Sequence, residues 1–243
     1  MAELVIQVGS RSAQGKRSNN EDTFVADPGE QVFLVADGMG GQEHGEVASG
    51  LAREIIPKVV RHSFAEHLDG TSAVRRALSE AHLAILEAGK ENTSCRRMGT
   101  TAVLAVRQNG QMCVAGVGDS PAYLVRGDEV EQLTLDHTIA DALARNGTIT
   151  ADQAKKSPYR NILYRFLGCR EMTDETEVRL FTPQAGDRLL LVSDGLSGHV
   201  DADDLRRGAT GFPSAQAWAD YLVDLALERG SSDNVTCVVV AFG

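Results

Sequence analysis

Short apolar segments joined by tight turns constrain the fold of this 243-residue chain more than any other feature. Segments 100–106 and 111–117 meet at Asn109-Gly110, a dipeptide typical of two-residue hairpins, and 122–125 and 130–133 flank a turn at 126–128. Such short connections favour antiparallel strands, because a parallel crossover needs a dozen or more residues. Further strands are expected at 4–8, 23–26, 32–36, 177–181, 188–192 and 235–242.

Apolar residues that recur every fourth position predict two helices, at about 47–59 and 74–85. Pro57 lies inside the first helix and is expected to kink or end it. A third helix is expected at about 214–228, with Gly230 closing it. Helices beside antiparallel sheets predict an α+β fold: a four-layer α–β–β–α sandwich with two central antiparallel sheets flanked by helix pairs.

The chain shows no linker, repeat or low-complexity stretch, so residues 1–243 are expected to form a single domain. Residues 136–168 differ from their surroundings, because they are polar, are expected to form short helices and separate two strand regions. An insertion of this kind is often a mobile functional element. We refer to residues 136–168 as the flap.

Charge and composition exclude several classes of protein. The net charge of −10 argues against nucleic acid or an anionic membrane as a general partner. No apolar run approaches the length of a membrane span and the first residues lack the basic start of a signal peptide, so we expect a cytoplasmic protein. Cys113 and Cys237 lie in apolar strand-like runs, and the four cysteines have no C-x-x-C spacing, so buried reduced thiols are expected.

Aspartates stand at or beside the ends of four strand-like runs: Asp37, Asp119, Asp194 and Asp233. A carboxylate held there is partly desolvated, which is costly unless a cation neutralises it. Glu21 and Asp22 extend the set to six acids, and no equivalent cluster of lysines accompanies them. Hard divalent cations prefer oxygen ligands, so the sequence predicts a metal-dependent enzyme.

Six short motifs follow one another along the chain: GKRSNNED (15–22), DGMGG (37–41), GTT (99–101), GDS (118–120), SDGL (193–196) and DNVT (233–236). Each motif alone is a weak signal, because Asp-Gly and Asp-Asn are ordinary turn sequences. Together and in this order they are highly specific. The chain resembles the metal-dependent protein phosphatase (PPM, type 2C) family of serine/threonine phosphatases over nearly its whole length. Its flap, through Asp136-His137-Thr138, Asn161 and Leu167-Gly168, is similar to the bacterial branch.

The resemblance implies a binuclear centre for Mn²⁺ or Mg²⁺. In that centre the Asp37 carboxylate bridges two ions and the Gly38 carbonyl ligates one of them. Glu21, Asp194 and Asp233 would supply the remaining carboxylates. Two such ions with a shared water supply a nucleophile at neutral pH.

A third, weaker ion is implied between Asp119 and Asp194. Pro121 follows the GDS motif where family members commonly have arginine, which makes the packing of this loop a departure from the pattern. Asn234 is expected to orient the ligands, and Thr100-Thr101 to support the site structurally.

Arg17 and Asp22 are implied to act on the phosphate and on the water. A guanidinium grips two phosphate oxygens in a planar fork, which suits Arg17 to binding the substrate phosphate. Asp22 would hydrogen-bond the attacking water and orient it or accept its proton. Glu21 and Asp22 are adjacent, so on a strand their side chains would point to opposite faces.

The resemblance implies hydrolysis of phosphoserine and phosphothreonine in proteins by direct attack of the metal-activated water. No covalent phosphoenzyme is expected, because no cysteine or histidine lies in a nucleophile context. The expected partners are phosphorylated proteins, a eukaryotic-like bacterial Ser/Thr kinase and its substrates, including forkhead-associated proteins, and the chain is expected to be a monomer. Two alternatives stay open: a non-catalytic phosphoprotein-binding module of the same fold, and another two-metal hydrolase such as a nuclease. The complete acid set disfavours the first, and the absence of a basic stripe disfavours the second.

Met39 stands where eukaryotic members of the family have a histidine that is implied to protonate the leaving alkoxide. Methionine cannot donate a proton, so a metal-bound water or His44 would have to do so.

Replacing His44 by alanine tests this role. We expect His44→Ala to hydrolyse an aryl phosphate within about twofold of the wild-type rate, because the leaving group is already acidic and needs no general acid. Steady-state kinetics at a fixed Mn²⁺ concentration measure this rate. A large loss would mean that His44 has a different function.

Overall fold

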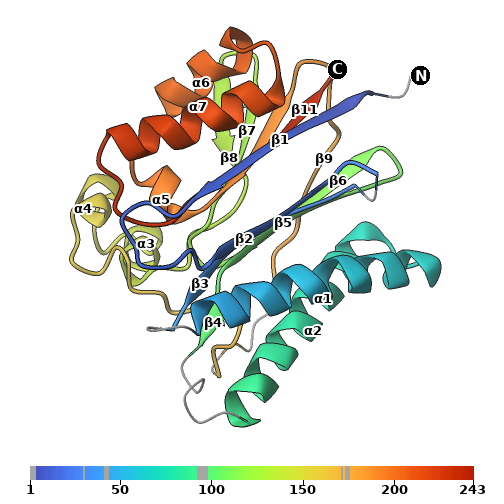
Figure 1. Cartoon of the computed structure of the whole chain (residues 1–243), viewed down its shortest axis with the longest axis vertical. Helices are drawn as coiled ribbons and strands as arrows, with labels where there is room; N and C mark the ends of the chain where they lie inside the picture. Colours follow the sequence, from blue (N-terminus) through green and yellow to red (C-terminus); the bar gives the residue numbers. More distant parts are fainter. Residues whose placement is uncertain (1–3, 30, 41–43, 92–97, 171, 173–175) are drawn as a thin grey trace.

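Two antiparallel sheets form the centre of the computed structural model, which describes residues 4–29, 31–40, 44–91, 98–170, 172 and 176–243 (Figure 1). The first sheet contains, in spatial order, β1 (Ile6–Ala13), β11 (Val235–Phe242), β10 (Arg188–Val192), β7 (Ala122–Arg126) and β8 (Glu129–Gln132). The second contains β2 (Asp22–Asp27), β3 (Val32–Met39), β5 (Ala102–Gln108), β6 (Gln111–Val117) and β9 (Arg179–Phe181), with β4 (Gly99–Thr100) paired to β3. The hairpins expected at Asn109-Gly110 and at residues 126–128 are confirmed as β5–β6 and β7–β8.

Helices cover the outer face of each sheet, which confirms the four-layer sandwich (Figure 1). Against the second sheet pack α1 (Gly45–Ala65) and α2 (Gly70–Glu91). Against the first pack α5 (Asp194–Ser197), α6 (Ala202–Gly211) and α7 (Ala215–Glu228). The flap contains α3 (Ile139–Arg145) and α4 (Ala151–Lys155).

Alternation along the central strands assigns each side chain to one of the layers. On β3, Phe33 and Val35 point between the sheets, whereas Val32, Leu34 and Ala36 face α1 and α2. Strand β11 follows the same rule, with Val238, Val240 and Phe242 between the sheets and Cys237 and Val239 facing α7. Side chains alternate between the two faces of a pleated strand. The direction of the residue after each apolar run therefore follows from the same alternation.

Two sequence predictions need correction. Helix α1 is longer than the expected 47–59, since it spans Gly45–Ala65 with Pro57 inside it, because Ile56, Val59 and Val60 keep an apolar stripe buried in the helix-facing core. Strand β1 begins and ends later than expected, at Ile6–Ala13, because it pairs with β11 along its whole length although its second half is polar.

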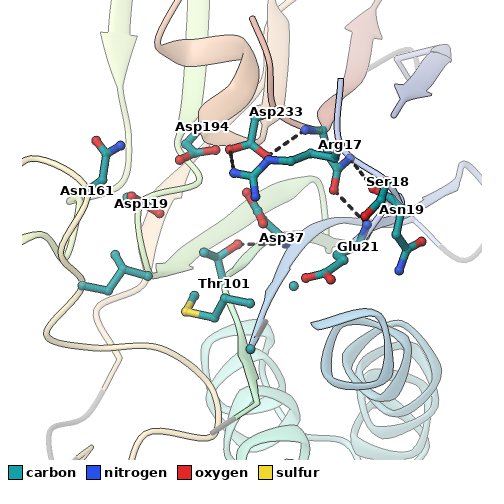
Figure 2. A pocket seen from close by; sticks show the side chains of 15 residues that line it. Arg17, Ser18, Asn19, Glu21, Asp37, Thr101, Asp119, Asn161, Asp194 and Asp233 are labelled. Atoms are coloured by element: carbon teal, nitrogen blue, oxygen red, sulfur yellow. Dashed lines mark hydrogen bonds and ion pairs between the residues drawn. The ribbon is translucent and has the colours of Figure 1, made fainter. Parts of the chain in front are cut away.

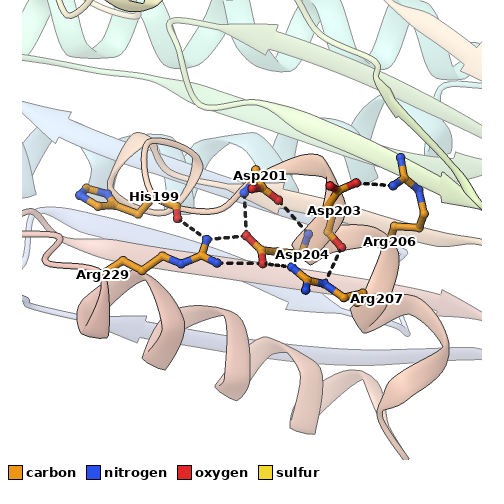
Figure 3. A network of polar contacts seen from close by, with 7 residues as sticks. All are labelled: His199, Asp201, Asp203, Asp204, Arg206, Arg207 and Arg229. Atoms are coloured by element: carbon orange, nitrogen blue, oxygen red, sulfur yellow. Dashed lines mark hydrogen bonds and ion pairs between the residues drawn. The ribbon is translucent and has the colours of Figure 1, made fainter.

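Helix α6 was not predicted, since Ala202–Gly211 carries charge rather than a long apolar stripe. A reciprocal capping box begins it: the Asp204 N–H donates to Asp201 Oδ1 (2.9 Å) and the Asp201 N–H donates to Asp204 Oδ2 (3.0 Å). Figure 3 shows that Arg207 and Arg229 converge on the same Asp204 carboxylate, with Nη2–Oδ1 distances of 2.8 and 2.9 Å. Asp204 therefore ties α6 to the end of α7.

None of the helices in the described ranges is both long and apolar enough to cross a membrane. Cys113 and Cys237 are buried free thiols, as expected, whereas Cys95 lies outside the described residues.

Asp204→Asn should lower the free energy of unfolding by about 2 kcal/mol at pH 7, because it breaks a buried, charge-assisted network. The Arg229 hydrogen bond lowers the pKa of Asp204 to about 2, so its stabilisation is present above the pKa of the unfolded state and is lost as pH falls through about 2. The difference in the free energy of unfolding between the wild type and Asp204→Asn should therefore shrink between pH 4 and pH 2, as measured by urea titration. Arg207→Ala, at a side chain that is 73% exposed, is the control and should cost less than about 0.5 kcal/mol.

Candidate metal centre

All predicted acids except Asp22 line one pocket of about 390 Å³, at the end of the sandwich where β3 and β10 finish. Figure 2 shows its side chains from close by. The residues that line it are Arg17, Ser18, Asn19, Glu21, Asp37, Gly38, Met39, Gly40, Thr101, Asp119, Asn161, Leu163, Asp194, Asp233 and Asn234. All predicted metal ligands are among them. Two predicted site residues are not, namely Asp22 and His44.

Asp37 continues the series of β3 side chains that point between the sheets. Phe33 and Val35 precede it on that face, so the strand delivers the carboxylate to the open end of the inter-sheet layer. Its backbone is fixed by Thr101, whose hydroxyl accepts from the Asp37 N–H (3.0 Å), and by Thr100, whose hydroxyl donates to the Asp37 carbonyl (2.9 Å). The threonines thus have the supporting position that the sequence predicted.

Gly38 is required by close packing rather than by its backbone angles. A Cβ built on Gly38 would lie 2.2 Å from the Gly45 carbonyl oxygen and 2.7 Å from that of Glu21. A Cβ on Gly45 would in turn lie 2.0 Å from Glu21 Oε2. The two glycines therefore let the start of α1 and the Glu21 loop approach the end of β3.

Asp22 lies behind the pocket and bridges the two sheets. Its Oδ2 accepts from the hydroxyls of Ser193 (2.9 Å) and Thr236 (2.7 Å), which follow β10 and lie on β11. Burial raises the pKa of Asp22 to about 6. Glu21 faces the pocket instead, so the two adjacent acids point in different directions, as expected.

Negative charge accumulates on the pocket wall. Burial, followed by the charges of Asp22, Asp194 and Asp119, raises the pKa of Asp37 well above its usual value. Burial and the neighbouring Asp194 raise the pKa of Asp119 to about 7, and burial and Asp233 raise that of Asp194. The ionised forms of these groups repel one another and need a cation.

Arg17 supplies one positive charge to this wall. Its Nη2 donates to Asp233 Oδ2 at 2.6 Å, and the side chain remains 59% exposed (Figure 2). Asn234 holds the loop that carries Arg17: its Nδ2 donates to the carbonyls of Gln14 (2.8 Å) and Asn19 (2.9 Å), and its Oδ1 accepts from the Glu21 N–H (2.9 Å). One amide thus positions both Arg17 and Glu21.

The donor set fits divalent cations. Asp194 Oδ1 is buried and, among the described residues, has no hydrogen-bond partner, which leaves its lone pairs for a ligand from the pocket. Carboxylates together with the nearby Gly38 carbonyl are the oxygen ligands that Mg²⁺ and Mn²⁺ accept. In the described ranges, however, no three His, Cys, Asp or Glu side chains already form a closed ligand cluster.

The sequence did not predict the role of the flap in the pocket wall. Asn161 and Leu163 line the pocket, and they alternate with Ile162, which is exposed. Figure 2 shows Asn161 beside Asp119. This alternation was present in the sequence, but a three-residue pattern is too short to indicate a strand-like segment. His44 occupies the N-cap position of α1 without a side-chain capping hydrogen bond and does not line the pocket, whereas Met39 does.

Comparisons with known proteins agree with this geometry. The family described as Protein phosphatase 2C matches residues 9–238. The serine/threonine protein phosphatase PstP of Mycobacterium tuberculosis is 34% identical over 239 residues, which are 97% of this chain but only 45% of that protein. The serine/threonine phosphatase stp of Listeria monocytogenes is 32% identical over 238 residues, covering 95% of this chain and 93% of that protein.

Solved structures show the same fold. The crystal structure of the Mycobacterium tuberculosis serine/threonine phosphatase PstP/Ppp superposes with a TM-score of 0.86 at 32% identity, covering 98% of this chain and 99% of that one. The catalytic domain of PstP in complex with two manganese ions gives a TM-score of 0.80 at 32% identity and covers 99% of both chains.

Asp37→Asn should raise the thermal midpoint of the metal-free protein by about 2–4 °C, because folding no longer has to bury or neutralise a carboxylate among other acids. Millimolar Mn²⁺ should stabilise the wild type strongly, by about 2.7 kcal/mol at 100 times the dissociation constant, and should stabilise the variant far less. Differential scanning calorimetry with and without Mn²⁺ measures both effects. Asp128→Asn, at an exposed turn, is the matched control and should change neither. A lower midpoint for metal-free Asp37→Asn would contradict this explanation.

Proposed function

Because the chain belongs to the protein phosphatase 2C family, we propose that it hydrolyses phosphoserine and phosphothreonine in proteins. The observation that carries this proposal is the pocket in which acids from both sheets face a single exposed arginine. Such a wall repels a phosphate unless cations stand between them, so it suits a metal-dependent reaction on a phosphate ester.

We propose that Asp37, Glu21, Asp194, Asp233 and the Gly38 carbonyl hold two Mn²⁺ or Mg²⁺ ions. A third, weaker ion would lie at Asp119 and Asp194. When bound, the ions would supply positive charge for the phosphate and activate the attacking water. The relative crystallised with two manganese ions supports this assignment.

Arg17 would bind the substrate phosphate by exchanging partners. Its guanidinium is already at the mouth of the pocket, held by Asp233 through a single 2.6 Å contact, and most of its surface is open to solvent. The guanidinium of Arg17 would turn from Asp233 to two phosphate oxygens, which its planar fork fits. Asn234 keeps this loop in place, so the exchange needs only side-chain rotation.

The direct role of Asp22 in orienting the water stays a prediction. Its Oδ2 is used by Ser193 and Thr236, but its Oδ1 is buried and, within the described ranges, has no hydrogen-bond partner. That free oxygen is the atom that would accept a hydrogen bond from the water.

Two alternatives are less well supported. A non-catalytic phosphoprotein-binding module would not need the complete acid set, which is present here. A nuclease would need a cationic track for the nucleic acid backbone, whereas the net charge is −10.

We further propose that the phosphatase reverses a eukaryotic-like bacterial Ser/Thr kinase and acts on its substrates, forkhead-associated proteins among them. This partnership and the cytoplasmic location rest on the sequence alone.

A phosphothreonine peptide, an aryl phosphate and a DNA oligonucleotide separate these functions. We expect Mn²⁺-dependent turnover of the first two, none of the third, and complete loss with EDTA. Arg17→Lys should lose about 10-fold or more in kcat/KM on the peptide, because an ammonium cannot make the bidentate contact. Asp37→Asn should lose about 1000-fold. Turnover that persists in EDTA would overturn the metal-dependent proposal.

A further inference from the structure

Exposed apolar side chains are concentrated on the flap and next to it. Of the nine large ones in the described part of the chain, four lie between residues 135 and 164, each 43–49% exposed: Leu135, Tyr159, Ile162 and Tyr164. The other five are scattered over distant elements, from Val5 to Tyr221. Scattered apolar residues are normal on a surface, whereas a local concentration beside a pocket indicates an interaction site.

One segment, residues 159–164, forms both the pocket wall and this outer surface. Residues 159–164 pair with residues 137–140 through the Ile139 N–H to Ile162 carbonyl bond (2.8 Å) and the Tyr164 N–H to His137 carbonyl bond (3.0 Å). Asn161 and Leu163 line the pocket, while Ile162 between them is 45% exposed. A polypeptide that leaves the pocket on this side therefore passes over Ile162 and its neighbours.

The segment is held by fixed contacts. The Tyr164 ring stands edge-on to His137 at a centroid distance of 5.5 Å, and its hydroxyl accepts from Arg145 Nη2 (2.7 Å). His137 Nδ1 in turn accepts from the Gly118 N–H (3.0 Å), beside Asp119. A surface that is already ordered loses little conformational entropy on binding.

The charge of the flap is opposite to that of the rest of the chain. Residues 136–168 contain five Lys and Arg against three Asp, within a chain whose net charge is −10. Asp141 pairs with Arg145 at 3.8 Å, whereas Lys155, Lys156 and Arg160 are exposed and form no ion pair with any described residue. The cations that are left over can therefore pair with carboxylates of another molecule.

We propose that Lys155, Lys156, Tyr159, Arg160 and Ile162, the flap surface, bind the polypeptide next to the phosphorylated residue and favour segments that carry acidic residues beside an apolar one. The inference rests on the proposed function and names its substrate class. Charge complementarity indicates that the bound polypeptide segment is acidic. The acidic remainder of the molecule repels such a segment, and the flap surface attracts it. The apolar neighbour of the acids packs on Ile162 and Tyr159.

Phosphothreonine peptides of equal length, with acidic-plus-leucine, basic-plus-leucine and glycine-serine flanks, test the preference. We expect the wild type to give a kcat/KM about 10-fold higher on the acidic than on the basic peptide, and this ratio should fall as salt is added. Lys155→Gln/Lys156→Gln/Arg160→Gln should bring the ratio to within about twofold, mainly through KM.

A matched variant controls for the loss of three exposed cations. Lys58→Gln/Arg61→Gln/Lys90→Gln removes the same charge from α1 and α2, on the far side of the second sheet, and should keep the wild-type ratio.

A second pair of variants tests the apolar contacts. Tyr159→Ser/Ile162→Ser should reduce the kcat/KM advantage of leucine-containing over glycine-serine flanks about threefold or more. Leu83→Ser, at a side chain 59% exposed on α2, should not.

The outcomes separate the two proposals. If the wild type with Mn²⁺ hydrolyses neither the aryl phosphate nor any peptide, the proposed function fails and the flap surface with it. If it hydrolyses all peptides with equal kcat/KM, or if the flap variant keeps the acidic preference, the inference about the flap surface is wrong while the proposed function stands. Loss of the preference in the flap variant alone, with an unchanged thermal midpoint, supports it.

Discussion

Repulsion among carboxylates at one end of the two-sheet core is the constraint on which the rest of the structure depends. Asp22, Asp37, Asp119 and Asp194 all have raised pKa values, and burial is the largest cause for each. A fold can hold such groups together only if other interactions outweigh the cost. The apolar layer between the sheets supplies these, with Phe33, Leu191 and Val238 fully buried, because each such side chain contributes about 1.5–3 kcal/mol. The site is therefore placed at the open end of a strongly apolar layer.

Contacts between distant parts of the sequence assemble the site. The loop that carries Arg17 and Glu21 is fixed by Asn234, more than two hundred residues away, and Arg17 itself reaches Asp233. Asp22 at the start of β2 is joined to Ser193 and Thr236 of the opposite sheet. Each acid is rigid because the backbone beside it belongs to a paired strand or to a loop clamped by side-chain hydrogen bonds. This rigidity is what a metal centre needs, since ligand positions must be set before the ion arrives.

The sequence predicted the layers, most strands and the acids of the pocket, because strand alternation, hairpin turns and the position of Asp after an apolar run are local signals. It could not predict that α1 continues to Ala65, well beyond Pro57, since packing of Val59 and Val60 against the core outweighs the local preference. Helix α6 was missed because its stability depends on Asp204 and the distant Arg229. The predicted ligands do line one pocket, but the place of Asp22 behind it and the contribution of Asn161 depend on tertiary contacts that no short motif encodes.

The position of Asp22 has a consequence for how this protein can vary. The carboxylate proposed to orient the attacking water also joins the two sheets, so under that proposal one residue serves both the framework and the chemistry. Substitutions that strengthen the framework by replacing Asp22 with an apolar residue would remove a group from the site. The proposed role of Asp22 thus couples stability and catalytic power at this residue, and adaptation to heat would proceed elsewhere in the molecule, for example in the outer helices.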